Sequence, residues 1–183
     1  VYPLPRLFPV EPDRVKEIRL DVTPVVVDVA PNLKYAGVAF GGSIPGPTMR
    51  VRVGDRVRIV MTNRTDESVA GLPASPTQVA FETEVSTLPS PAATGPGQTV
   101  TIELTPTKPG VFLYKGAGPQ AVAAGLLGLM IVDGDKAAAP LADREYGVIL
   151  SELYLKPDPA ARKVNGASLQ VFDEAAAREG RPT

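Results

Sequence analysis

The stretch from Gly110 to Asp133, GVFLYKGAGPQAVAAGLLGLMIVD, decides the fold class that the sequence predicts. It contains two apolar runs, Val111 to Tyr114 and Leu127 to Val132, which have the length and residue types of buried strands. Between them lies a loop of Gly, Ala, Pro and Gln that can fold back over the end of a sheet. The stretch therefore predicts two strands and a connecting loop, and we expect any chemistry of the chain at that loop.

Shorter runs of alternating apolar and polar residues lie on both sides of this stretch. They occur at 18–29, 33–40, 51–61, 99–104 and 146–155, with Pro, Asn and Gly between them. The first two runs, joined by Pro31 and Asn32, predict a hairpin. In total the pattern predicts about eight or nine short strands, which is typical of an antiparallel sandwich or barrel.

The chain divides into three parts. Residues 1–16 contain four prolines and predict an extended arm. Residues 17–156 hold the predicted strands and form the single globular domain. Residues 157–183 are a linker-like tail, in which 173–179 predict a short helix that Gly180 ends.

The composition excludes several classes of function. The 183 residues include 19 basic and 20 acidic side chains, and this balance gives no field that would attract nucleic acid or anionic lipid. The chain has no Cys and no His, so it lacks the usual zinc and blue-copper ligands and the usual base for a nucleophile. No apolar run is long enough to span a membrane. We therefore predict no cofactor, no metal and no catalytic residue for the chain alone.

Four segments together resemble the N-terminal cupredoxin domain of copper nitrite reductases and, more distantly, of multicopper oxidases. They are GGSIPGPTMRVRVGDRVRIVMTN (41–63), SPTQVAFE (75–82), PGQTVTIELTPTKPGVFLYK (96–115) and AAGLLGLMIVDGD (123–135). The resemblance covers most of residues 17–158 and implies a Greek-key β-sandwich in an exported or periplasmic protein. As partners it implies further copies of the chain in a trimer, or a second cupredoxin domain.

The resemblance also implies where copper would bind, and this chain carries other residues at those positions. The type 1 copper positions are Thr77, Gly116, Ala121 and Leu126, the type 2 positions are Glu82 and Lys115, and the catalytic Asp position is Ala80. The resemblance places Glu82 and Lys115 side by side, so we predict that they form an ion pair. The four type 1 positions hold small or apolar residues, so we predict that this site closes over as ordinary core.

These replacements favour a copper-free cupredoxin-like domain with a structural or assembly role, and two alternatives stay open. The chain is the N-terminal scaffold domain of a longer copper oxidoreductase, of the nitrite reductase or multicopper oxidase type, whose metal ligands lie outside it. Alternatively, it is an engineered scaffold from which the metal ligands were removed. Enzymatic activity is not predicted for the chain alone; as part of an enzyme it would belong to a copper-dependent oxidoreductase.

Overall fold

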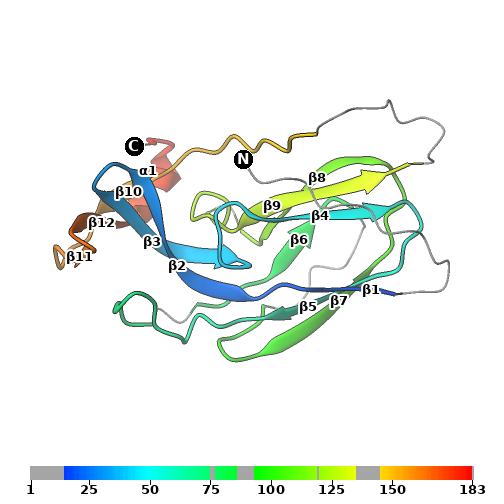
Figure 1. Cartoon of the computed structure of the whole chain (residues 1–183), viewed down its shortest axis with the longest axis horizontal. Helices are drawn as coiled ribbons and strands as arrows, with labels where there is room; N and C mark the ends of the chain where they lie inside the picture. Colours follow the sequence, from blue (N-terminus) through cyan, green and yellow to red (C-terminus); the bar gives the residue numbers. More distant parts are fainter. Residues whose placement is uncertain (1–14, 75–76, 86–92, 119, 135–144, 183) are drawn as a thin grey trace.

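A computed structural model of the chain describes residues 15–74, 77–85, 93–118, 120–134 and 145–182 (Figure 1). The strands are β1 (Lys16–Arg19), β2 (Val22–Ala30), β3 (Leu33–Phe40), β4 (Gly46–Arg52), β5 (Val57–Thr62), β6 (Phe81–Thr83), β7 (Thr99–Leu104), β8 (Gly110–Gly116), β9 (Leu127–Asp133), β10 (Leu155–Pro157), β11 (Lys163–Val164) and β12 (Ala167–Phe172), and the helix is α1 (Glu174–Glu179). The predicted N-terminal arm lies almost wholly outside the described residues. Within them, no helix has the length and hydropathy of a membrane span.

Two sheets face each other and enclose the main core. The first sheet has the order β4-β9-β8-β6 and the second has the order β1-β5-β7, and they form two layers in Figure 1. In β5, for example, Val57, Ile59 and Met61 are buried while the residues between them are half-buried, because successive side chains point to opposite faces of a strand. Both sheets contribute to one hydrophobic cluster that includes Val51, Tyr114 and Met130 from the first and Ile59 and Ile102 from the second. This arrangement confirms the all-β sandwich.

The predicted hairpin forms, but it starts later than expected. β2 and β3 pair antiparallel around a turn in which Asn32 adopts a left-handed conformation with φ 59°. The expected single strand at 18–29 is instead divided, since β1 pairs with β5 in the second sheet. β2 and β3 belong to a third sheet, with the order β10-β12-β3-β2, at one end of the sandwich (Figure 1).

The sheets are mixed, and the expectation of purely antiparallel layers is wrong. β4 pairs parallel with β9, β1 with β5, and β12 with β3. The two strands of each parallel pair are far apart in the sequence, so a long connection brings the chain back in the same direction. Local alternation of residues predicts a strand but not the direction of its neighbour.

The tail differs from the linker-like expectation. β12 pairs with β3, and Leu169 of β12 is almost fully buried. The predicted helix is present as α1, where the Asp173 side chain accepts hydrogen bonds from two backbone N–H groups and Gly180 (φ 65°) ends the last turn. Much of the tail is therefore an integral part of the third sheet.

The last predicted strand, 146–155, is wrong for most of its length. Residues 145–154 contain no strand, turn or bend, and β10 begins only at Leu155. Tyr146, Val148 and Leu150 are 60%, 72% and 92% exposed. The sequence has the alternation of a strand, but no described strand pairs with this segment, so no ladder forms.

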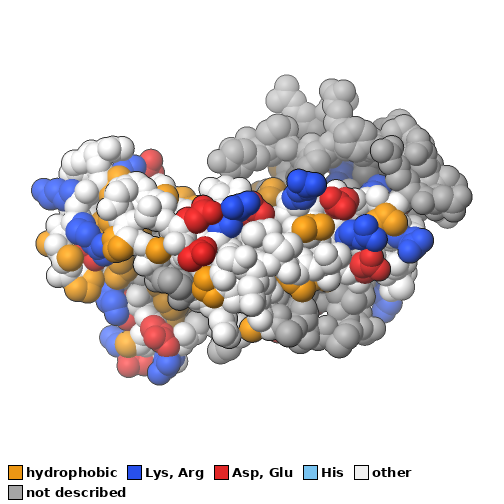
Figure 2. Space-filling model, turned by 90° about the horizontal axis from the view of Figure 1, so that it is seen from below, with side chains coloured by type: hydrophobic (Ala, Val, Ile, Leu, Met, Phe, Trp, Pro, Cys, Tyr) orange, Lys and Arg blue, Asp and Glu red, His pale blue; other side chains and the backbone are white. Residues whose placement is uncertain are grey.

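Charged side chains are dispersed over the face of the molecule that Figure 2 shows. In Figure 2, basic and acidic side chains are interspersed on the face shown, with no extended area of one sign among the coloured residues. Many of these charges are paired, as in the contact between Arg58 and Glu103 at 3.0 Å. This face therefore agrees with the nearly neutral composition.

Candidate functional site

The candidate site lies where β6 meets the end of β8. Glu82 lies opposite Lys115 in this antiparallel pair, and Phe81 lies opposite Gly116. Because side chains alternate along a strand, the first pair points out of the sandwich and the second points into it. The pairing thus places the two type 2 positions on the outer face and a type 1 position on the inner face.

Glu82 and Lys115 meet on the outer face. The Lys115 Nζ atom lies 3.9 Å from Glu82 Oε2, and the side chains are 38% and 32% exposed. Water screens a pair at this separation and exposure, so its contribution to the free energy of unfolding is about 1 kcal/mol or less. The contact is an ion pair of half-exposed residues.

A side chain at Gly116 would crowd two residues of the loop after β8. A Cβ atom at Gly116 would lie 3.0 Å from the Cβ of Ala121 and 3.1 Å from the Cβ of Leu126. The Gly116 N–H donates to the Leu126 carbonyl at 3.0 Å, which holds the loop against the strand end. A side chain at this position would therefore require Ala121 and Leu126 to move by a few tenths of an ångström.

The loop after β8 is fixed by hydrogen bonds within the loop and to two other segments of the chain. The Ala117 N–H donates to the Ala80 carbonyl at 2.8 Å, and the Leu126 N–H donates to the Ala121 carbonyl at 2.9 Å. From the third sheet, the Tyr35 hydroxyl donates to the Ala124 carbonyl at 2.9 Å. Burial raises the pKa of Tyr35 to about 12, so this hydroxyl keeps its proton to a higher pH than a solvent-exposed tyrosine does.

Thr77 is held by a buried polar network. The side chains of Asn63 and Thr65, both fully buried, donate to the Thr77 carbonyl at 2.8 Å and 3.1 Å. The Thr77 N–H donates to Thr65 Oγ1 at 3.0 Å. The Asn63 amide also donates to the Thr94 carbonyl at 2.8 Å, so one side chain joins two segments beside the site.

An open pocket of ≈ 580 Å³ lies over the type 1 positions, with walls from residues 77–80, from the loop after β8, and from Phe172 and Arg178. Thr77, Gly116, Ala121 and Leu126 all line it, as does Ala80. The prediction that the site closes over as ordinary core is therefore wrong for this region, although Gly116 and Leu126 are buried. The small side chains at these positions do not fill the pocket, and hydrogen bonds hold the loop after β8 so that it cannot move into the space.

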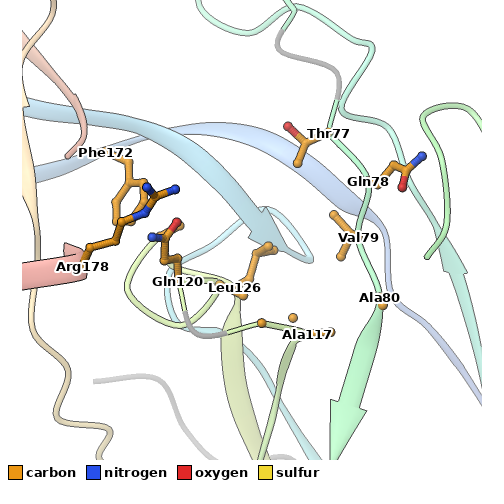
Figure 3. Close-up of a pocket in the computed structure, with 13 residues that line it drawn as sticks. Thr77, Gln78, Val79, Ala80, Ala117, Gln120, Leu126, Phe172 and Arg178 are labelled. Atoms are coloured by element: carbon orange, nitrogen blue, oxygen red, sulfur yellow. The ribbon is translucent and has the colours of Figure 1, made fainter. Parts of the chain in front are cut away.

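One wall of the pocket comes from the tail. Figure 3 shows Phe172, Arg178 and Gln120 together on one side, across from Thr77 to Ala80. With its amide oriented to satisfy both neighbours, Gln120 donates to Glu174 Oε1 at 3.2 Å and accepts from Arg178 Nε at 3.1 Å. The sequence indicated α1 through its caps, but no local signal placed it beside the loop.

The residues at the site do not fit a copper ion. Type 1 sites use imidazole and thiolate ligands, and the chain contains neither group. Across the described part of the chain, no group of three or more Asp or Glu side chains comes together to hold a metal of another kind. The pocket offers hydroxyl, amide and guanidinium groups from Thr77, Gln78, Gln120 and Arg178 among apolar atoms.

Comparisons with known proteins agree with the fold. The sequence pattern of the multicopper oxidase family matches residues 21–137. A copper-containing nitrite reductase of Neisseria meningitidis serogroup B is 27% identical over 161 residues, which are 85% of this chain and 38% of the relative. That of Alcaligenes xylosoxydans xylosoxydans is 32% identical over 130 residues, which are 64% of this chain and 38% of the relative.

Solved structures give the same result. A copper nitrite reductase from Nitrosomonas europaea superposes with a TM-score of 0.68 and 26% identity, covering 91% of this chain and 54% of that chain. A multicopper oxidase structure superposes with a TM-score of 0.57 and 30% identity, covering 70% of this chain and 45% of that chain. The chain thus spans about half of these proteins or less.

Proposed function

The chain belongs to the multicopper oxidase family, and we propose that it is a copper-free cupredoxin-like domain of that family with a structural or assembly role. The observation that carries the proposal is the chemistry of the site, because the pocket over the type 1 positions is lined by hydroxyl, amide, guanidinium and apolar groups and by no imidazole or thiolate. At Gly116 an added side chain would also crowd Ala121 and Leu126. The half-exposed pair of Glu82 and Lys115 at the type 2 positions supports it as well.

Metal titration tests the copper-free state. The purified chain is offered Cu(I) and Cu(II), followed by removal of free metal, elemental analysis and visible and electron paramagnetic resonance spectra. We expect no retained stoichiometric copper and no thiolate-to-copper absorption, because the ligand types are absent. One equivalent of copper held by side chains of this chain would contradict the proposal.

The assembly role predicts association between copies. The resemblance to copper nitrite reductases implies a trimer, and the outer face of the first sheet is the surface we assign to it. Next to the Glu82 and Lys115 pair, Val111 and Leu113 of β8 are 66% and 38% exposed. Light scattering after size-exclusion chromatography should give an oligomer, and a monomer at high concentration counts against an assembly role. By the same resemblance we propose an exported or periplasmic location, which cell fractionation tests.

A second candidate is a scaffold domain within a longer copper oxidoreductase. It is favoured by the extent of the matches, since the chain spans 38% of the Neisseria meningitidis relative. In that case the metal ligands lie in another part of the polypeptide or in a partner. The intact mass and the copper content of the protein isolated from its natural source distinguish the two candidates.

A further inference from the structure

The turn between β11 and β12 holds an asparagine followed directly by a glycine, the only such pair in the sequence. Asn165 and Gly166 form a two-residue loop at the end of the molecule away from the two facing sheets (Figure 1). Their φ angles are 51° and 81°, both in the left-handed region, as a type I′ hairpin turn requires. The turn geometry explains why these residue types occur here, but the pair also has a chemical reactivity that the fold does not require.

The reactive atoms are the Asn165 Cγ and the Gly166 backbone nitrogen. When this nitrogen attacks Cγ, a new C–N bond closes a cyclic imide and the bond from Cγ to the side-chain nitrogen breaks. The side-chain nitrogen leaves as ammonia, which carries away the proton of the Gly166 N–H. Water then opens the imide at either of its carbonyls and gives aspartate or isoaspartate. Glycine favours the attack because it has no Cβ beside the nitrogen.

The structure leaves both reacting groups accessible. Asn165 and Gly166 are exposed, and a Cβ added at Gly166 would meet no atom within 4 Å. Among the described residues, the Asn165 side chain has no hydrogen-bond partner, and the Gly166 N–H donates to no backbone carbonyl. Water therefore reaches the turn, and no hydrogen bond has to break before the two atoms meet.

The other asparagines of the chain lack this combination. Asn32 is exposed and left-handed, with φ 59°, but Leu33 follows it and its carbonyl accepts a hydrogen bond from the Ser168 N–H at 2.9 Å. Asn63 is fully buried, and its amide donates to two backbone carbonyls at 2.8 Å. The chain thus contains its own controls for the exposure and for the following residue.

We propose that Asn165 is a site of spontaneous deamidation, which converts this turn to isoaspartate with water as the only other reactant. The attack requires the peptide between Asn165 and Gly166 to rotate out of the turn geometry. β11 contains only Lys163 and Val164, so the turn is held on one side by a strand of two residues. Such a hairpin end opens at a small fraction of the free energy of global unfolding, and the reaction proceeds from the folded chain.

Isoaspartate at this position should separate β11 from β12. Val164 and Ala167 lie opposite each other and are 9% and 7% exposed, and Val164 packs in a small cluster with Leu72 and Leu169. Isoaspartate adds one carbon to the backbone of the loop, and the loop length sets the register of a hairpin. β12 keeps its pairing with β3 and β10, so the rest of the third sheet should remain.

Peptide mapping of the incubated chain tests the site. The purified protein is held at neutral and at alkaline pH, digested with trypsin, and analysed by mass spectrometry with electron-transfer fragmentation, which distinguishes isoaspartate from aspartate. We expect the peptide of residues 164–178 to gain the mass of an amide-to-acid conversion and to contain isoaspartate. The extent should be several-fold greater at Asn165 than at Asn32 or Asn63, and it should rise with pH because the attacking nitrogen must lose its proton.

Asn165→Gly is the matched control. A pair of glycines also favours the type I′ turn, so this variant should keep the circular dichroism spectrum of the parent while lacking the amide that reacts. After the same incubation, amide hydrogens of residues 163–167 should exchange with deuterium faster in the parent than before incubation. Exchange in incubated Asn165→Gly should be unchanged. A parent sample incubated in urea gives the extent of reaction in the unfolded chain.

The possible results either support or overturn the assignment of the site. Equal extents of deamidation at Asn165 and Asn32 overturn it. Reaction at Asn165 in urea but not in the folded chain also overturns it, because the turn then does not open. Isoaspartate with unchanged deuterium exchange overturns the separation of β11 from β12. None of these results depends on copper binding or oligomeric state, so they test the modification apart from the proposed function.

Discussion

Replacing Gly116 by Ala should destabilise the domain, although the backbone there is compatible with any residue. The added Cβ would lie 3.0 Å from Ala121 Cβ and 3.1 Å from both Cβ and Cδ1 of Leu126. Normal contacts between carbon atoms are about 3.5–4.0 Å, so several neighbours must move together. Extra methyl groups in a packed interior cost about 1–3 kcal/mol, and we expect a loss of that size for Gly116→Ala.

Urea unfolding followed by circular dichroism measures the loss, with Gly134→Ala as the control. A Cβ at Gly134 would lie 3.4 Å from its nearest neighbour, Pro109, so that variant should stay within about 0.5 kcal/mol of the parent. Combining Gly116→Ala with Ala121→Gly removes the contact between the two Cβ atoms. The free energy of unfolding lost through Gly116→Ala should therefore be smaller in the double variant. A Gly116→Ala protein as stable as the parent, or an unchanged cost beside Ala121→Gly, would refute the packing argument.

Three further predictions concern polar groups. Because the pKa of Tyr35 is about 12 in the folded chain and about 10 when unfolded, the unfolded state releases its proton first, so stability should fall between pH 10 and 12. In urea titrations over this pH range, the free energy of unfolding of the parent should fall by up to about 2–3 kcal/mol more than that of the Tyr35→Phe variant. A double-mutant cycle with Glu82→Gln and Lys115→Met should give a coupling below about 1 kcal/mol that weakens further in high salt. Asn63→Ala removes a fully buried amide that bonds to the carbonyls of Thr77 and Thr94 and should lower the free energy of unfolding by about 2–4 kcal/mol, whereas a loss under about 1 kcal/mol would contradict the role given to the network.

The parts of the fold that the sequence predicted are those with a local cause. The run from Leu127 to Val132 is apolar throughout and became β9, which is buried between two neighbours. Asn32 tolerates a left-handed turn conformation, and Asp173 and Gly180 supply the caps of a short helix. Each of these features depends on a few residues that are adjacent in the sequence.

The features that the sequence did not predict depend on residues far apart in the chain. The strand pattern from Tyr146 onward has no local sign that a partner strand is lacking. The pocket exists because Tyr35 supports the Ala124 carbonyl and α1 contacts Gln120, and these partners are separated by more than fifty residues in the sequence. The parallel pairing of β12 with β3 is of the same kind.

The weak attachment of α1 gives the pocket an adjustable wall. The helix has no buried residue, and its last turn is closed by the N–H groups of Gly180 and Arg181 bonding to carbonyls within the helix. A unit of this kind opens at a small fraction of the free energy needed to unfold the sandwich. The amide hydrogens of Gly180 and Arg181 should therefore exchange with solvent deuterium far faster than those of β8, and each opening moves Arg178 away from the pocket that it lines.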